Sequence, residues 1–195
     1  GRARCCRARL SFVSPLSELL LGGLFAGSYL ELGFSPELFG MLLALSVLLP
    51  LVLYDLAHQI LPPPLLSGFV AISAATSLAS DPSSEAFLLS FMVALIPAVF
   101  LALIHFLSRG RAMGLADVPF VFGLGLLFGA PAAFPGLVFS FWIGAVIGII
   151  VLLGRPRGSR MGIEVPFAPF LAAGFILAYF TQWNPFAFLA SLALF

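Results

Sequence analysis

Long apolar runs alternate with short polar turns along almost the whole chain. Most runs are close to the ~20 residues that an α-helix needs to cross a bilayer at about 1.5 Å per residue. The runs lie at about residues 16–34, 38–54, 64–80, 86–107, 114–134, 136–153 and 167–181. This pattern predicts an all-α polytopic membrane helix bundle with about seven transmembrane helices.

The composition excludes a soluble globular domain. Of the 195 residues, 62% are hydrophobic and 9% are charged, and none is lysine. A soluble protein of this length carries roughly a quarter of its residues as charged side chains. We therefore expect the lipid bilayer to surround this chain, and we expect no nucleic-acid partner.

The arginines predict how the helices are oriented. Basic residues in short loops mark the cytoplasmic side of a membrane protein. All nine arginines lie in three segments, at positions 2–9, at 109 and 111, and at 155–160. If seven helices alternate from a cytoplasmic N-terminus, these three segments all face the cytoplasm and no arginine is left on the other side.

Residues 1–15 form a basic segment ahead of the first apolar run, and residues 16–195 are predicted to be the transmembrane domain. The segment has no apolar core of a signal peptide and begins with Gly1, so we expect a longer N-terminal part to precede it. Its two cysteines, Cys5 and Cys6, are adjacent and predict no disulfide framework.

Two acids stand out among the polar residues at the ends of the apolar runs. Asp55 ends the second run and Asp117 begins the fifth, so the predicted alternation puts both on the cytoplasmic side at one depth. An acid close to hydrocarbon is costly, roughly 2.5 to 3.5 kcal/mol at a helix centre, and so indicates a functional site. A loop aspartate that caps the next helix is the simpler interpretation of Asp117.

Two carboxyl groups at one depth in a low dielectric cannot easily both ionise, so the pair can share one proton. In an aspartic protease one carboxylate takes a proton from the attacking water while its protonated partner supports the developing oxyanion. The spacing alone leaves open two other interpretations: solvated acids at the membrane interface, and an ion-coupling site of a small proton-coupled transporter.

The segments around both acids resemble motifs of the type IV prepilin peptidases, a family of membrane aspartic proteases. Residues 55–62 (DLAHQILP) look like the first aspartate motif of that family, and residues 114–118 (GLADV) look like its second, G-x-G-D. Residues 165–170 (VPFAPF) are similar to the loop before the last helix of that family. Residues 10–20 are similar to the sequence at the start of its second helix. The resemblance covers essentially the whole chain.

The resemblance implies an aspartic endopeptidase that removes the short basic leader from type IV prepilins or pseudopilins. It implies Asp55 and Asp117 as the catalytic pair, at the cytoplasmic face of a bacterial inner (plasma) membrane, and no cofactor. Residues expected to support the substrate or the loops are Gly114, Ala116, His58, Pro166, Phe167 and Pro169. His58 follows Asp55 by one helical turn and is either a partner of that acid or an interfacial histidine; His105 is expected to be a solvated helix end.

Three departures from the family motifs bear on activity. Ala116 replaces a glycine of the second motif, Pro119 replaces a lysine, and Pro63 replaces an acid. If that glycine is needed for positive φ, the Ala116 methyl strains the loop. These departures leave open a catalytically weakened homologue that binds pilin-like proteins without cutting them.

Two further features of full-length members of this family are not expected in this chain. Full-length relatives often hold zinc on two C-x-x-C pairs, whereas this chain has Ala3 where a thiol belongs, so no metal site is predicted. N-methylation of the new pilin terminus is linked to an N-terminal region largely missing from this chain, so it is not carried over.

Tyr54-Asp55 and residues 114–117 (GLAD) also look like the Y-D and G-x-G-D motifs of presenilin-type proteases. The oligomeric state and the individual pilin are not predicted.

Overall fold

The computed structural model describes residues 13–80, 83–111, 113–154 and 166–183, and these contain helices and no strands. The basic segment at residues 1–12 and both cysteines lie outside this part. The helices are α1 (Val13–Leu32), α2 (Pro36–His58), α3 (Pro63–Ser80), α4 (Ser84–Leu107), α5 (Asp117–Leu153) and α6 (Ala168–Thr181).

The predicted all-α membrane bundle is confirmed. Among the described residues four helices are long and apolar enough to cross a bilayer, namely α2, α3, α5 and most of α4. Helix α6 is apolar but has only 14 residues. The number of seven spans and the cytoplasmic N-terminus stay predictions.

Helix α5 is broken at Gly129, where φ is 73° and ψ is −176°. Glycine reaches this region without the clash that a Cβ would cause. Pro131 follows in the first turn of the second half, where a missing backbone N–H breaks no hydrogen bond. The two apolar runs at 114–134 and 136–153 therefore do form two helical segments, but they separate at Gly129 and not near residue 135.

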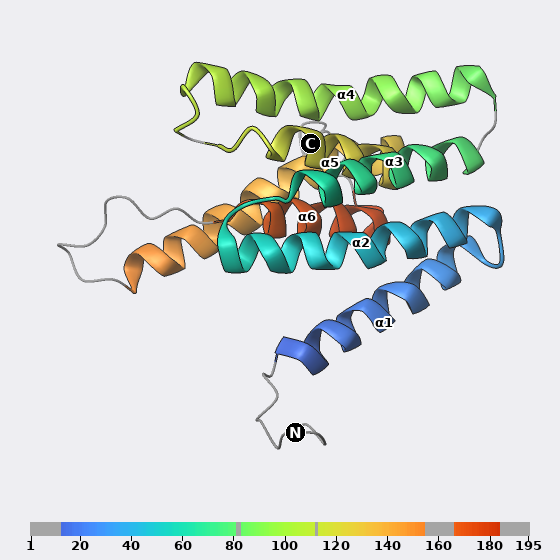
Figure 1. Cartoon of the computed structure of the whole chain (residues 1–195), viewed down its shortest axis with the longest axis horizontal. Helices are drawn as coiled ribbons and strands as arrows, with labels where there is room; N and C mark the ends of the chain where they lie inside the picture. Colours follow the sequence, from blue (N-terminus) through green and yellow to red (C-terminus); the bar gives the residue numbers. More distant parts are fainter. Residues whose placement is uncertain (1–12, 81–82, 112, 155–165, 184–195) are drawn as a thin grey trace, which may run out of the picture.

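Helix α5 is the centre of the bundle and packs against α3, α4 and α6 (Figure 1). Small residues permit its closest approaches: a methyl group on Gly125 would lie 2.9 Å from Ala94 of α4. The hydroxyl hydrogen of Ser140 of α5 is shared between the carbonyl oxygens of Gly136 and, across to α6, of Leu171, at 2.7 and 3.3 Å. Close contacts of this kind hold helices together in lipid, where burial of apolar surface gives no driving force.

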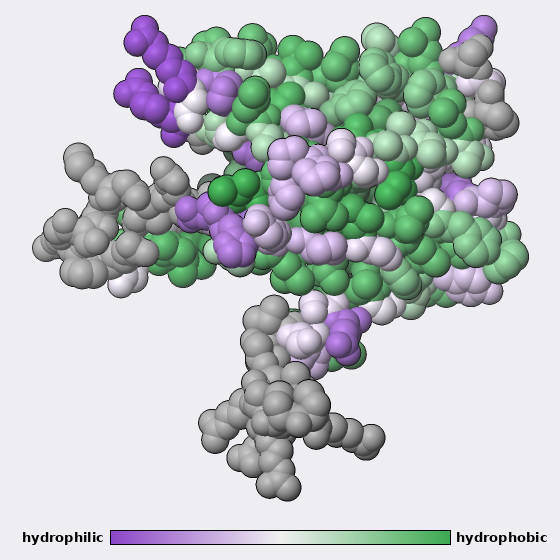
Figure 2. All heavy atoms as spheres, in the orientation of Figure 1, coloured by the Kyte–Doolittle hydropathy of each residue, from purple (hydrophilic) through white to green (hydrophobic). Residues whose placement is uncertain are grey.

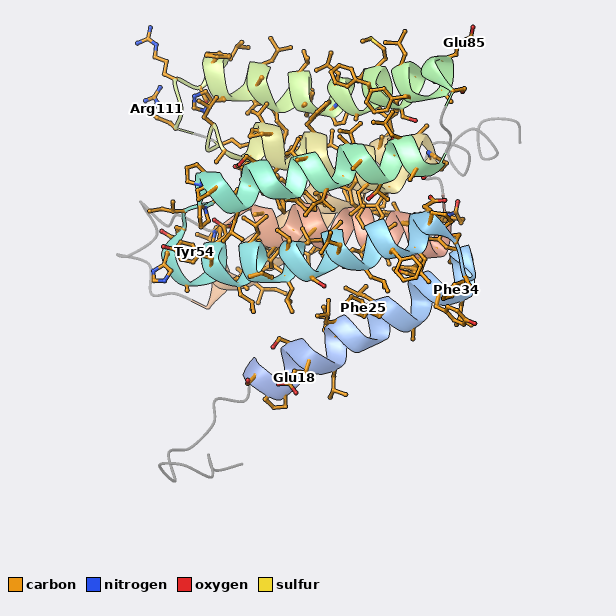
Figure 3. The ribbon with its side chains drawn as sticks, turned by 45° about the vertical axis from the view of Figure 1, so that its right-hand side comes forward. Glu18, Phe25, Phe34, Tyr54, Glu85 and Arg111 are labelled. Atoms are coloured by element: carbon orange, nitrogen blue, oxygen red, sulfur yellow. The ribbon has the colours of Figure 1, made fainter. Side chains whose placement is uncertain are left out.

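On the face drawn in Figure 2 the surface of the bundle is mostly apolar, with weakly polar residues near the middle and the most strongly polar ones toward the two ends. Tyr54 and Arg111 lie at one end, and Glu85 and Phe34 lie at the other (Figure 3). Many large apolar side chains on this surface are exposed, among them Leu88, Leu89, Ile149 and Ile150. This distribution fits a bundle whose sides face lipid and whose ends face water.

Candidate active site

Asp55 lies in the last turn of α2, and the sequence around it explains why the helix ends there. Ser35 caps the start of α2, since its hydroxyl accepts a hydrogen bond from the Leu38 amide at 3.2 Å. At the other end Gln59 adopts the left-handed conformation, with φ 56°, and its amide donates to the Asp55 carbonyl oxygen at 2.7 Å. The Asp55 side chain is only 6% exposed.

Asp117 is the first residue of α5 and is supported by its own loop. Its carboxylate accepts a hydrogen bond from the Gly114 amide at 3.2 Å, and its amide donates to the Gly114 carbonyl oxygen at 3.3 Å. The positive end of the helix dipole favours a carboxylate at this position. The side chain is 8% exposed, so two nearly buried acids stand at one end of the bundle.

Both acids line one cavity of about 470 Å³. Around them are the chain after α2, the loop before α5 and the start of α6. The residues that line the cavity are Asp55, Gln59, Ile60, Leu61, Gly110, Arg111, Met113, Gly114, Leu115, Ala116, Asp117, Pro166 and Phe167.

Asp55 lies against the start of α6. The backbone N–H of Ala168, the first residue of α6, is close to the Asp55 carboxyl group. The Oδ2 atom of Asp55 is buried and has no partner within the described part of the chain. A buried carboxylate oxygen without a partner is expensive, so a protonated or proton-sharing Asp55 fits this environment better than an isolated charge.

The loop supports predicted from the sequence divide into two groups. Gly114, Ala116, Pro166 and Phe167 line the cavity. Pro169 faces a different, apolar cavity between α1, α2 and α6.

His58 is not among the residues that line the cavity. It is exposed, and its ring packs on that of Tyr54 with the centroids 4.5 Å apart. The structure therefore brings four of the six predicted support residues to the acids.

His105 was expected to be a solvated helix end, and this expectation is wrong. Its Nδ1 lies 2.8 Å from the carbonyl oxygen of Met113, and because a carbonyl only accepts, Nδ1 carries the proton. Gly110, with φ 73°, packs against the ring, where a Cβ would lie 3.3 Å away. His105 thus ties the loop before Asp117 to α4, a contact for which the sequence carried no signal.

The departures from the family motifs fit the backbone as it stands. Ala116 has φ −68° and ψ −20°, an ordinary right-handed conformation that needs no glycine. Pro119 is the third residue of α5 and is exposed, and the amide of that position has no partner inside a helix anyway. Pro63 begins α3, where proline is well suited.

No group of three or more histidine, cysteine, aspartate or glutamate side chains that could hold a metal ion occurs among the described residues. The polar groups that line this cavity within the described residues include two carboxyl groups, the Gln59 amide and the Arg111 guanidinium.

Comparison with known proteins points to one family. The model of the type IV leader peptidase family matches residues 42–151, a range that includes both acids. The prepilin leader peptidase/N-methyltransferase of Bacillus subtilis is 30% identical over 194 residues, which are 100% of this chain and 76% of that protein.

Other relatives carry the same name. The protein from Myxococcus xanthus is 33% identical over 81% of this chain and 48% of its own length, and that from Legionella pneumophila is 30% identical over 92% and 63%. The chain thus spans about half to three quarters of the length of these relatives. No solved structure gives a significant match.

Proposed function

The chain belongs to the type IV leader peptidase family, a family of proteases, and on this basis we propose that it is a membrane aspartic endopeptidase. Its substrates are type IV prepilins or pseudopilins, from which it removes the leader. The observation that carries the proposal is the pair of nearly buried acids, Asp55 and Asp117, in one cavity at an end of the bundle.

The pair works with one shared proton. The ionised carboxylate takes a proton from water as the water oxygen bonds to the peptide carbonyl carbon, and the protonated partner gives its proton to the carbonyl oxygen. The C–N bond of the tetrahedral intermediate then breaks as the first acid returns its proton to the leaving nitrogen. The former carbonyl oxygen re-forms its double bond and returns its proton to the second acid, so the pair again holds one proton.

The cavity is proposed to open toward the cytoplasm of a bacterial inner membrane. Arg109 and Arg111 belong to the loop between α4 and α5 that borders the acids, and arginines in short loops favour the cytoplasmic side. The wall of the cavity is a mixture of backbone, acid and apolar side chains, which suits a peptide in extended form.

The weakened-homologue alternative rests on Ala116, Pro119 and Pro63. The backbone accommodates all three residues, since Ala116 has ordinary helical angles and both prolines lie in the first turn of a helix, so the remaining difference from the family motifs is the loss of the lysine and acid charges. A transporter would need a polar path across the bundle, whereas the described acids of this cavity stand at one end only.

Cleavage of a type IV prepilin by the purified protein in lipid vesicles tests the proposal. Asp55→Asn and Asp117→Asn should each lower the rate by about 10²- to 10⁴-fold, the usual contribution of a general acid or base. Glu85→Gln changes an exposed acid at the far end of the bundle and is the matched control, which should cleave like the wild type. If the wild type binds prepilin but cleaves it no faster than Asp117→Asn does, the peptidase proposal is wrong and the chain is the catalytically weakened homologue.

A further inference from the structure

Among the described residues that line the candidate active-site cavity, one side chain is positively charged. It is Arg111, in the loop between α4 and α5. Arg111 is exposed, whereas Asp55 and Asp117 of the same cavity are 6% and 8% exposed. Figure 3 shows Arg111 at the same end of the bundle as Tyr54 of α2. Arg111 therefore lies at the water-facing rim of the cavity, and the two acids lie deeper inside it.

A turn at the end of α4 places Arg111 at this rim. Arg109 adopts the left-handed conformation, with φ 55°, and Gly110 follows with φ 73°. The Gly110 amide donates to the carbonyl oxygen of His105 at 2.8 Å. The Arg111 amide donates to the carbonyl oxygen of Ser108 at 3.3 Å. Turns of this kind commonly end a helix, and here the turn fixes the direction in which the chain enters the cavity wall.

A second contact fixes the chain on the other side of Arg111. The His105 ring donates to the Met113 carbonyl oxygen at 2.8 Å. The Arg111 side chain makes one hydrogen bond to a described residue, from Nε to the Ser108 carbonyl oxygen at 3.4 Å. The terminal nitrogens of the guanidinium take no part in that bond. The loop therefore holds the base of this side chain and leaves the end of the guanidinium for a ligand.

Arg109 does not share this position. It lies two residues earlier in the same turn and is exposed, but it is not among the residues that line the cavity. Of the two arginines in this loop, one thus lies at the cavity and the other lies outside it. Their comparison separates an effect of the cavity from an effect of charge at this end of the bundle.

Peptide cleavage creates a group that the acid pair repels. The bond that breaks leaves a carboxylic acid at the end of the leader and an amine at the start of the mature chain. At neutral pH the new carboxylic acid loses its proton to water and becomes a carboxylate. The acid pair again holds one proton and therefore one negative charge. Two like charges repel, and they do so more strongly where water is excluded.

We propose that Arg111 binds the new carboxylate of the cleaved leader as the leader leaves the acids. This inference rests on the proposed function, because cleavage of a peptide bond produces this group inside the cavity. A guanidinium can form two parallel hydrogen bonds with a carboxylate, which an ammonium group cannot. Arg111 is thus a product-binding residue at the rim, and Asp55 and Asp117 stay the catalytic pair.

Two forms of the leader peptide test the proposal. One form ends in a free carboxylate and the other in an amide, and both carry a dye at the N-terminus. Their binding to the protein in phosphatidylcholine vesicles, which do not attract a basic peptide by charge, is measured by fluorescence anisotropy. We expect the wild type to bind the carboxylate form about tenfold more tightly, a difference of ~1.4 kcal/mol. Arg111→Gln should bind both forms equally, and Arg111→Lys should keep part of the preference.

Arg109→Gln is the matched control. It removes the same charge from the same loop, at a position outside the cavity. It should keep the tenfold preference for the carboxylate form, because general attraction by the positive loop acts through both arginines and binding at the rim acts through Arg111. Both arginines are exposed, so neither variant should change the thermal unfolding midpoint.

Prepilin cleavage, measured in the same vesicles, separates this proposal from the peptidase. If the wild type cleaves prepilin but binds the two peptide forms equally, the carboxylate site is wrong and the peptidase stands. The same conclusion holds if Arg109→Gln loses the preference as fully as Arg111→Gln. If the wild type does not cleave prepilin, the peptidase is wrong, and the product site is wrong with it because no product forms.

Discussion

Asp55 and Asp117 share one cavity, but the chain holds them by different means. Asp117 is supported within four residues by the Gly114 amide and by the start of its own helix. The Asp55 carboxyl group lies against the amide of Ala168, more than a hundred residues further along the chain. One acid is therefore positioned locally and the other by the packing of α6, so changes at α6 should affect the acids unequally.

Removing the Ala168 amide should have the largest effect of the changes that leave both acids in place. Ala168→Pro deletes the N–H that faces the Asp55 carboxyl group. Its ring also enters a buried position and disfavours the right-handed conformation of Phe167 before it, which has φ −95° and ψ −25°. A polar partner of a charged group contributes ~1.5–3 kcal/mol, so prepilin cleavage should fall about 10- to 100-fold, with some loss of stability as well.

The control for Ala168→Pro is the thermal unfolding midpoint in detergent, and cleavage is measured well below the midpoint of the variant, where the protein is folded. An unchanged cleavage rate in a well-folded variant would mean that Asp55 does not depend on α6.

Removing the hydrogen bond from His105 to the Met113 carbonyl oxygen should have a smaller effect, because the hydrogen bonds between Gly114 and Asp117 also support this loop. His105→Gln cannot present a donor at the place of Nδ1, whereas His105→Asn can, since its amide NH₂ reaches that place. Losing one hydrogen bond of ~1 kcal/mol should lower kcat about fivefold in His105→Gln, with KM unchanged, and Asn should restore most of it.

His58→Gln is the matched control for this pair, because His58 is exposed and packs on Tyr54 outside the cavity. Equal losses in His105→Asn and His105→Gln would show that the ring packs without positioning the loop.

The smallest effect is expected at Ala116. Its φ of −68° suits alanine and glycine alike, so Ala116→Gly should change the cleavage rate by no more than about twofold. A tenfold gain measured in the same vesicle assay would instead mean that the Ala116 methyl strains the loop and weakens this enzyme.

The sequence predicted the parts of this fold that depend on local pattern. Long apolar runs gave the helices, and the run lengths together with the arginines put Asp55 and Asp117 at one end of the bundle. It did not predict the break at Gly129, because a run rich in glycine and proline offers several places for a break. Nor did it predict the Ala168 amide at Asp55 or the bond from His105 to Met113. Both are contacts between separate elements, on which a local pattern carries no information.

A double-mutant comparison tests the central claim that Asp55 and Asp117 act as one catalytic unit. Single-turnover prepilin cleavage is measured for Asp55→Asn, Asp117→Asn and the double variant in the same vesicles. Residues that act as a unit give losses that do not add, so the double variant should cleave no more slowly than the slower single variant. Losses that multiply in the double variant would contradict a shared role for the two acids.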